Sequence, residues 1–500
     1  MDKGGIFLRQ KLPIFYSALL LTGVNLLLRT VATSFQVYLS GRIGAAGIGL
    51  LQLVLSVGGM ALTAGMAGIR TATMYLTAEE LGHKRSGNVT WVLSGCIGYS
   101  ILCSGAIGLL LQVFAPTLAQ SWIGDESTEN AIRLLGAFLP VHCLCGVMTG
   151  YFTAANRIRT LAVVEVVEQL LYMAVTLTAL GYLAGDDPAK ACQCVVLGSG
   201  ISACLTLVCL VTLRVLEHPK TNKRLPVGKR LLRIAVPLAL ADDLKAGIST
   251  TENLMVPKRL GLYAAVADPL AAFGMVCGMV FPILMFPAAI LFGLNELLIP
   301  ELARCNAAGS QKRIRYLTKR TLRVAMLYGC ICCGLEYLMA EFLCLRLYGN
   351  SEAAVYLKKF AILIPMLYCD MVTDAMTKGL GQQNACVRYN ILTSLLDVLF
   401  LYILLPKYGM DGYFLSFTVT HLLNFVLSLR RLSKITKLSF PLGIATVIGV
   451  ATALCLYLCS FPNHILIRCA AFPASFFAIL TLLGILNKED LHWVRSLIHH

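Results

Sequence analysis

The sequence predicts an all-α polytopic membrane protein with about 14 transmembrane helices, in two pseudo-symmetric six-helix lobes plus two C-terminal helices. The first supporting observation is composition: the 500 residues are 57% hydrophobic and only 14% charged, and the mean hydropathy is +0.75. Soluble domains carry roughly 25% charged residues, so lipid must be the solvent for much of this chain. The second is a regular series of apolar runs, and the third is the placement of basic residues between them.

The apolar runs are each long enough for a helix that crosses a bilayer, which needs about 20 residues. The first run contains Pro13, Asn25 and Arg29 and does not end like a cleavable signal peptide, so we treat it as a retained helix. We place the spans at residues 12–38, 45–75, 88–114, 129–155, 160–184, 191–213, 232–256, 269–299, 317–340, 354–377, 387–405, 411–429, 439–460 and 464–486.

The basic residues define an orientation for these spans. With a cytoplasmic amino terminus, about 29 of the 42 Lys and Arg residues fall in inside segments and about 8 in outside loops. Cytoplasmic loops collect Lys and Arg, so we expect both termini to be cytoplasmic. The same distribution explains the net charge of +16 without nucleic acid as a partner.

An internal repeat divides the chain. A shift of 229 residues pairs Gly150 with Gly379, Arg159 with Arg388 and Glu168 with Asp397. Parallel repeats of this kind place a binding site between the halves, near the membrane midplane. We therefore expect an N-terminal lobe, a basic cytoplasmic linker, a C-terminal lobe, and two additional helices with a cytoplasmic tail, at residues 1–214, 215–231, 232–430 and 431–500.

Charged residues inside spans are the first candidates for a site. A charge near a helix centre costs about 2.5–3.5 kcal/mol on insertion scales, so such a group should face a water-filled cavity or a partner. The seventh span carries Asp242, Asp243, Lys245 and Glu252. Asp242 and Lys245 are three residues apart, so they share a helix face and can pair. The alternative is a neutral pair with only a packing role.

Further charges lie on other spans. Asp370, Asp374 and Lys378 follow at four-residue steps and form one stripe on the tenth span, where structural pairing is again the alternative. Glu165, Glu168 and Asp397 are candidates for coupling or for pairing between helices, and Arg29 for the cavity wall or for reaching the membrane surface. We expect Arg70 to extend to the cytoplasmic surface.

Proline and glycine predict bends, and cysteine predicts packing. Pro282 and Pro287 should bend the eighth span, and Gly58, Gly59, Gly65 and Gly68 should do the same on the second. Most of the 19 Cys residues lie in apolar runs, so we interpret them as small packing residues. The sequence contains no cluster with metal-ligand spacing, no catalytic nucleophile motif and no phosphate-binding glycine loop, so we expect neither a cofactor nor a metal.

Several motifs together resemble a known family. They are Asn25–Thr30 with Gly41–Gly49; Gly146–Phe152 followed by Glu165–Gln169; Pro287–Pro300 followed by Glu301; Lys378–Gln382; and Leu405–Gly412. Over nearly the whole chain they resemble the polysaccharide-biosynthesis and stage V sporulation protein B branch of the multidrug/oligosaccharidyl-lipid/polysaccharide exporter superfamily.

The resemblance implies two six-helix lobes around a V-shaped cavity in a bacterial cell membrane. It also implies a flippase that moves an undecaprenyl-linked saccharide, such as a peptidoglycan precursor, from the inner to the outer leaflet by alternating access. In related lipid flippases a cavity arginine on the first helix matches Arg29, whereas the sporulation branch commonly has Pro at the position of Arg70. Arg29, Asp242, Lys245, Asp370 and Asp374 are then the expected cavity residues.

Two alternatives remain open at the level of sequence. One is a cation- or proton-coupled multidrug exporter of the same superfamily, although no Asp lies between Pro13 and Ser40, where such exporters often carry one. The other is a membrane glycolipid enzyme, for which the adjacent Asp242 and Asp243 are poor evidence. We expect a transporter and not an enzyme, a monomer, with an anionic lipid-linked oligosaccharide, membrane lipids and cell-wall synthases as partners.

Overall fold

The computed structural model describes residues 4–83, 85–185, 187–216, 227–438, 442–461 and 464–485. Every regular element in these ranges is a helix. Most of the predicted linker at residues 215–231 and the predicted tail beyond residue 485 lie outside the described residues.

The helices form two compact units. The amino-terminal unit comprises Thr30–Gly278 and Val398–Met410, and the carboxy-terminal unit comprises Met1–Arg29, Met279–Asp397 and Asp411–His500. Helices α1 (Gly4–Met66) and α14 (Gln383–Thr436) contribute to both units, and each is kinked at a glycine with positive φ, Gly44 and Gly409.

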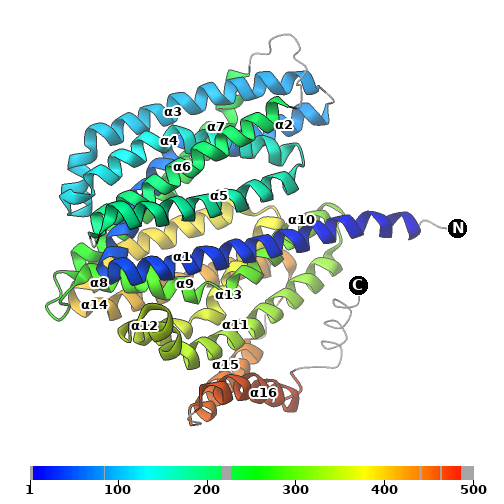
Figure 1. Cartoon of the computed structure of the whole chain (residues 1–500). Coiled ribbons are helices and arrows are strands. Elements are labelled where there is room, and N and C mark those ends of the chain that lie inside the picture. Colours follow the sequence, from blue (N-terminus) through cyan, green and yellow to red (C-terminus); the bar gives the residue numbers. More distant parts are fainter. Residues whose placement is uncertain are drawn as a thin grey trace. The chain divides into compact units, whose positions relative to one another are not determined.

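The amino-terminal unit is a bundle in which α3 packs against α4, and α6 packs against both α4 and α5 (Figure 1). Its helices after α1 are α2 (Ile69–Gly82), η1 (Ser86–Asn88), α3 (Val89–Thr117), η2 (Leu118–Ile123), η3 (Glu126–Thr128), α4 (Glu129–Ala154), α5 (Ile158–Ala179), η4 (Leu180–Ala184), α6 (Pro188–Val215), α7 (Gly228–Leu260), α8 (Pro269–Gly274) and most of η5 (Met275–Val280).

Two of these helices begin at the same local signal. Asp187 and Asp268 each precede a proline, and each carboxylate accepts a hydrogen bond from a backbone N–H in the first turn, at 2.9 Å. An aspartate cap followed by proline at the first helical position is a strong start signal, because proline has no N–H that needs a partner there.

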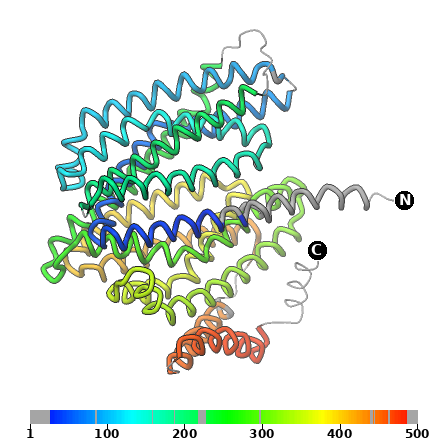
Figure 2. Tube along the Cα trace, in the orientation of Figure 1, coloured from blue at the N-terminus to red at the C-terminus, as the bar shows by residue number. Residues whose placement is uncertain are grey.

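The carboxy-terminal unit is built around α11, which packs against α12, α13, α15 and α16; Figure 2 shows α15 and α16 in orange and red beside it. Phe472 and Phe476 of α16 are fully buried in an apolar cluster with Cys330 of α11 and Ile448 of α15. Its helices are α9 (Phe281–Leu284), α10 (Ala288–Ala307), α11 (Gln311–Tyr348), α12 (Glu352–Ala361), α13 (Ile364–Gly379), the rest of α14, α15 (Leu442–Cys459) and α16 (Ile465–Leu482).

The outer faces of the helices are apolar. On α3, Leu102, Leu109 and Val113 are 73%, 68% and 70% exposed. They are spaced seven and four residues apart and therefore share one helix face. A continuous exposed apolar face of this kind is stable only against lipid or another protein.

Seven helices in the described residues are long and apolar enough to cross a membrane, or eight if a bent pair counts as one span. Two of them have 57 and 54 residues, which at 1.5 Å per residue is far longer than a hydrocarbon core of about 30 Å. The chain is thus a multi-pass helical membrane protein, as predicted, and the count of fourteen stays a prediction.

The predicted bends are confirmed in part. The chain bends sharply between Leu284 and Ala288, at Pro287, as the sequence indicated. The second span is interrupted at one of its four glycines: the helix runs unbroken through Gly58, Gly59 and Gly65 and breaks at Ala67 and Gly68. All 19 Cys residues are free thiols and most are buried, in agreement with a packing role.

Candidate functional site

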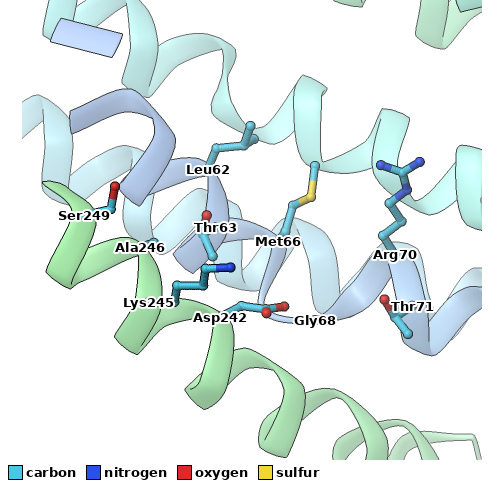
Figure 3. Close-up of a pocket in the computed structure, with 10 residues that line it drawn as sticks. All are labelled: Leu62, Thr63, Met66, Gly68, Arg70, Thr71, Asp242, Lys245, Ala246 and Ser249. Atoms are coloured by element: carbon cyan, nitrogen blue, oxygen red, sulfur yellow. The ribbon is translucent and has the colours of Figure 1, made fainter. Parts of the chain in front are cut away.

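A cavity of about 450 Å³ lies in the amino-terminal unit between the end of α1, the start of α2, and α7 (Figure 3). Its wall combines cationic, acidic, hydroxyl and apolar side chains. The lining residues are Leu62, Thr63, Met66, Gly68, Arg70, Thr71, Asp242, Lys245, Ala246 and Ser249.

The backbone break between α1 and α2 forms one edge of this cavity. Ala67 and Gly68 both have positive φ, of 43° and 70°. At Gly68, an added Cβ would lie 2.6 Å from the Ala235 carbonyl oxygen of α7, so only glycine allows this approach. The start of α2 therefore contacts α7 at Gly68, and the cavity opens beside that contact.

Asp242 and Lys245 line the cavity from α7, as their three-residue spacing predicted. Both are exposed, and Figure 3 shows both side chains directed from α7 toward the α1–α2 segment. The ion pair that the spacing permits is not formed: within the described ranges, neither side chain has a hydrogen bond or salt bridge. The neighbouring Asp243 is half-buried, with one carboxyl oxygen buried and unpartnered.

Arg70 lines the same cavity from α2. Its side chain is exposed, and Figure 3 shows the guanidinium pointing away from Lys245. Arg70 also attracts the carboxylate of Glu165 on α5. The sequence suggested that Arg70 reaches the membrane surface; the structure places it in the cavity wall.

Glu165 and Glu168 lie one turn apart on α5 and are both half-buried. Their charges repel each other, and Thr206 of α6 donates a hydrogen bond to Glu168. Glu165 is therefore attracted by a nearby cation, and Glu168 is held by a hydrogen bond between two helices.

Arg29 lies in the carboxy-terminal unit and is half-buried. Its guanidinium stands over the ring of Phe292 on α10, 5.5 Å from the centroid, and interacts with Tyr368 of α13. Ring contacts of this kind hold a guanidinium in place while leaving its N–H donors available for an anion.

The acidic stripe of α13 is divided between two kinds of partner. The Asn424 side-chain amide donates to both oxygens of Asp370, at 3.0 and 3.3 Å. Asp374 forms an ion pair of 2.6 Å with Lys378, which is the structural pairing that the spacing allows. Asp370 is thus held by a neutral amide, and Asp374 by a cation.

Asp397 is buried and accepts hydrogen bonds from two hydroxyl groups on the second half of α14, Ser416 at 2.6 Å and Thr420 at 3.1 Å. These contacts pair two helical segments, so the geometry favours the inter-helix role over the coupling role for this residue.

Sequence reasoning missed two buried acidic groups. Glu80 is 2% exposed and accepts hydrogen bonds from Asn88 at 2.9 Å and from Arg230 at 3.1 Å. Glu336 is 6% exposed and has no hydrogen-bond partner at either carboxyl oxygen. For Glu336 a signal existed, because it is the only charged residue between Arg323 and Glu341.

No group of three or more His, Cys, Asp or Glu side chains in the described part of the chain is arranged to hold a metal ion. The arrangement instead offers cations and hydroxyl groups on a membrane cavity wall, which can bind a polar anionic ligand.

Comparison with known proteins supports this description. A family model described as MatE matches residues 22–178. The stage V sporulation protein B of Bacillus subtilis (strain 168) is 23% identical over 446 residues, which cover 85% of this chain and 84% of that protein.

Two solved structures have the same fold. One is the inward-facing conformation of a multidrug resistance MATE family transporter, with a TM-score of 0.68 and 14% identity over 84% of this chain and all of the other. The second is the lipid II flippase MurJ in an inward closed conformation, with a TM-score of 0.68 and 12% identity over 94% of this chain and 98% of the other.

In sequence and fold the chain is similar to members of the multidrug/oligosaccharidyl-lipid/polysaccharide exporter superfamily. This confirms the resemblance found in the motifs, including the similarity to the sporulation branch. Members of the superfamily are transporters, and the expectation of a transporter instead of an enzyme agrees with these matches.

Proposed function

We propose that this protein is a flippase that moves an undecaprenyl-linked saccharide from the inner to the outer leaflet by alternating access. The observation that carries the proposal is the cavity wall with Lys245 and Arg70. A cation near the centre of a membrane helix costs about 2.5–3.5 kcal/mol on insertion scales. Lys245 has no hydrogen bond or ion pair within the described residues, and an anionic group of the substrate in the cavity would explain why both cations are retained.

The diphosphate that links an undecaprenyl chain to its saccharide is such a group, because guanidinium and ammonium groups donate several charge-assisted hydrogen bonds to phosphate oxygens. Thr63, Thr71 and Ser249 add hydroxyl groups to the same wall, which suit a sugar. A peptidoglycan precursor meets these requirements, and the names of two similar proteins, a lipid II flippase and a sporulation protein, support this choice.

Arg29 provides a second cationic position in this proposal, in the carboxy-terminal unit. Its half-buried guanidinium is held by Phe292 and Tyr368 and has no carboxylate partner in the described residues. We assign Arg29, Asp242 and Lys245 to substrate contact. Asp370, held by a neutral amide, and the pair Glu165 and Glu168 are candidates for coupling.

The predicted lobes and topology form part of the proposal. Gly150 and Gly379, which the predicted repeat pairs, each bring a helix end against a neighbouring backbone. An added Cβ would meet the Arg70 carbonyl oxygen at 2.5 Å in one case and the Ile299 carbonyl oxygen at 2.9 Å in the other. This similarity supports two related lobes. We propose further that they lie in a bacterial cell membrane, with both termini cytoplasmic. A monomer that delivers its product to cell-wall synthases completes the proposal.

A leaflet-specific accessibility assay for lipid-linked precursor tests the function in cells that depend on this protein. We expect Arg29→Ala and Lys245→Ala to reduce precursor at the outer leaflet while the protein still inserts in the membrane. Arg133→Ala and Lys190→Ala are matched controls, because each removes one exposed cation outside the cavity wall. Equal flipping by cavity and control variants would contradict the assignment.

A cation- or proton-coupled multidrug exporter is the second candidate. It is favoured by the MatE match over residues 22–178 and by the similarity to a multidrug resistance transporter. Drug efflux from vesicles that contain the purified protein, with no effect on lipid-linked precursor, would favour this function over flipping.

A further inference from the structure

Glu336 is a buried acidic residue near the middle of α11, in the carboxy-terminal unit. Its residue exposure is 6%, and both carboxyl oxygens are buried without a hydrogen-bond partner. It differs in this from the other buried acids of the membrane helices described above: Asp397 accepts from two hydroxyls, and Asp370 accepts from an amide.

Within the described residues, the groups on which the Glu336 carboxyl acts electrostatically carry no positive charge. They are Tyr328, Cys332 and Cys333 of α11 and Tyr368 of α13. The Arg29 guanidinium acts electrostatically on Tyr368 and stands over the ring of Phe292. The rings of Tyr328 and Tyr368 stack on each other, with their centroids 5.8 Å apart.

The hydroxyl groups of both tyrosines already donate hydrogen bonds to backbone carbonyl groups. Tyr328 donates to the Pro287 carbonyl at 2.8 Å, and Tyr368 donates to the Leu284 carbonyl at 3.2 Å. Both acceptors lie at the bend between α9 and α10. Neither hydroxyl is thus available to stabilise a negative charge on Glu336.

The charged groups on the other helices packed against α11 are engaged elsewhere. On α12, Lys358 forms an ion pair of 2.6 Å with Glu341, and Arg468 of α16 acts on that same Glu341. On α10, Glu301 pairs with Arg304 and Arg313. The buried faces of α15 and α16 bring Cys455, Cys459 and aromatic rings to the cluster around Cys330.

An ionised carboxylate in this position would be buried without donors or a counter-ion, which is among the most unfavourable arrangements in a protein interior. We propose that Glu336 is a proton-binding site, neutral in this conformation, which releases its proton when the α9–α10 bend rearranges. The step breaks the carboxyl O–H bond and transfers the proton to water that enters as the helices separate.

The two tyrosine hydrogen bonds provide the link to conformation. A broken helix is where transporters commonly rearrange, and both bonds end on carbonyl groups of that break. When the break moves, the hydroxyls lose their acceptors and turn to other partners, and the Glu336 carboxyl group, which acts electrostatically on both tyrosines, offers two unpartnered oxygens. Donation from Tyr328 or Tyr368 would then stabilise the carboxylate, so proton release follows the movement.

This inference deepens the proposed transport function, since it adds a proton to the transport cycle, but its first test needs no substrate. A hydrophobic carbodiimide reacts only with a protonated carboxyl group: the acid proton moves to a carbodiimide nitrogen, the carboxyl oxygen bonds to the central carbon, and acyl transfer to nitrogen gives a stable adduct. We would treat the purified protein in detergent with dicyclohexylcarbodiimide and map adducts by mass spectrometry of the peptides.

We expect a Glu336 adduct in the wild-type protein and none in Glu336→Gln. Labelling should fall by about tenfold for each pH unit above its midpoint, as for a single titrating group. Glu341 lies on the same helix, is exposed and is paired with Lys358, so it is the internal control and should stay unlabelled over the same range. Glu341 labelling equal to that of Glu336 would overturn the assignment.

Thermal unfolding provides a second measurement in case the reagent cannot reach the site. If the folded state retains a proton that the unfolded state gives up, wild-type protein loses stability relative to Glu336→Gln as pH rises. Glu341→Gln should not reproduce this trend. A difference between wild type and Glu336→Gln that is independent of pH would overturn the proposal.

Transport assays then separate the two claims. Glu336→Gln should flatten the pH dependence of flipping while substrate affinity stays unchanged. If adduct formation and unfolding behave as expected but neither this variant nor Arg29→Ala alters flipping, the proton site stands and the proposed function fails.

Discussion

A close backbone approach beside the cavity, at Gly68, gives a prediction with a defined magnitude. Replacing Gly68 with Ala adds one methyl group at a residue with φ of 70°. A non-glycine residue in the left-handed region costs about 1–2 kcal/mol. The new Cβ would also lie 2.6 Å from the Ala235 carbonyl oxygen and 3.2 Å from the Ala239 nitrogen, both backbone atoms of α7.

Backbone atoms cannot move aside as a flexible side chain can, so α7 must shift as a unit. Overpacking of this kind costs about 1–3 kcal/mol. Together the two terms predict that Gly68→Ala lowers the free energy of unfolding by about 2–5 kcal/mol. Because α7 also carries Asp242 and Lys245, the same shift should weaken substrate binding at the cavity.

Thermal unfolding of the purified protein in detergent measures the first effect. Gly59→Ala is the matched control: Gly59 is helical and exposed on α1, with no heavy atom within 4 Å of an added Cβ. Alanine there should stabilise the helix by about 0.5–1 kcal/mol. If Gly68→Ala unfolds at the wild-type temperature, the tight α2–α7 contact does not exist in the membrane protein.

Three further substitutions test individual contacts. Glu80→Ala leaves the buried Asn88 amide without its acceptor and removes one of the two carboxylates paired with Arg230, so it should cost about 1–3 kcal/mol in unfolding free energy. Glu79→Ala, at a partly exposed ion pair, should cost under about 1 kcal/mol. Asp397→Ala should also cost about 1–3 kcal/mol, because it removes the carboxylate that accepts hydrogen bonds from two buried hydroxyl groups; wild-type stability in chemical denaturation would argue against that pairing. Gly334→Ala places a methyl group 1.9 Å from the Phe472 ring and should destabilise the protein, and Phe472→Leu in the same chain should restore part of the loss.

Hydropathy and charge placement predicted the helices well where each span is one uninterrupted helix. The predicted range 129–155 matches α4 to within one residue, and 191–213 lies inside α6. The tenth span, predicted at 354–377, is two helices, α12 and α13, with a break after Ala361. Hydropathy stays high through such a break, because only the backbone changes and not the apolar character of the side chains.

The site was predictable only where its geometry is local. A three-residue spacing placed Asp242 and Lys245 on one face of α7, and a four-residue spacing paired Asp374 with Lys378. Partners that are distant in sequence were not predictable: Asn424 holds Asp370 from 54 residues away. Local spacing defines which side chains share a face, but tertiary packing decides which of them remain without a partner.

That distinction separates the intramembrane charges by role. Asp397 accepts hydrogen bonds from two hydroxyl groups, and Asp374 forms an ion pair with Lys378, so packing accounts for their presence. Lys245 and Asp242 have no hydrogen bond or ion pair in the described chain, yet both face a cavity where water or substrate can solvate them. Glu336 is 6% exposed and has no hydrogen-bond partner among the described residues, so a charge there would be uncompensated. The free-energy cost of an uncompensated charge therefore assigns the cavity charges to ligand binding and the buried Glu336 carboxyl group to proton binding. Substitutions in the two places should then affect transport differently. Cavity variants should change substrate affinity, and the Glu336 variant should change the pH dependence.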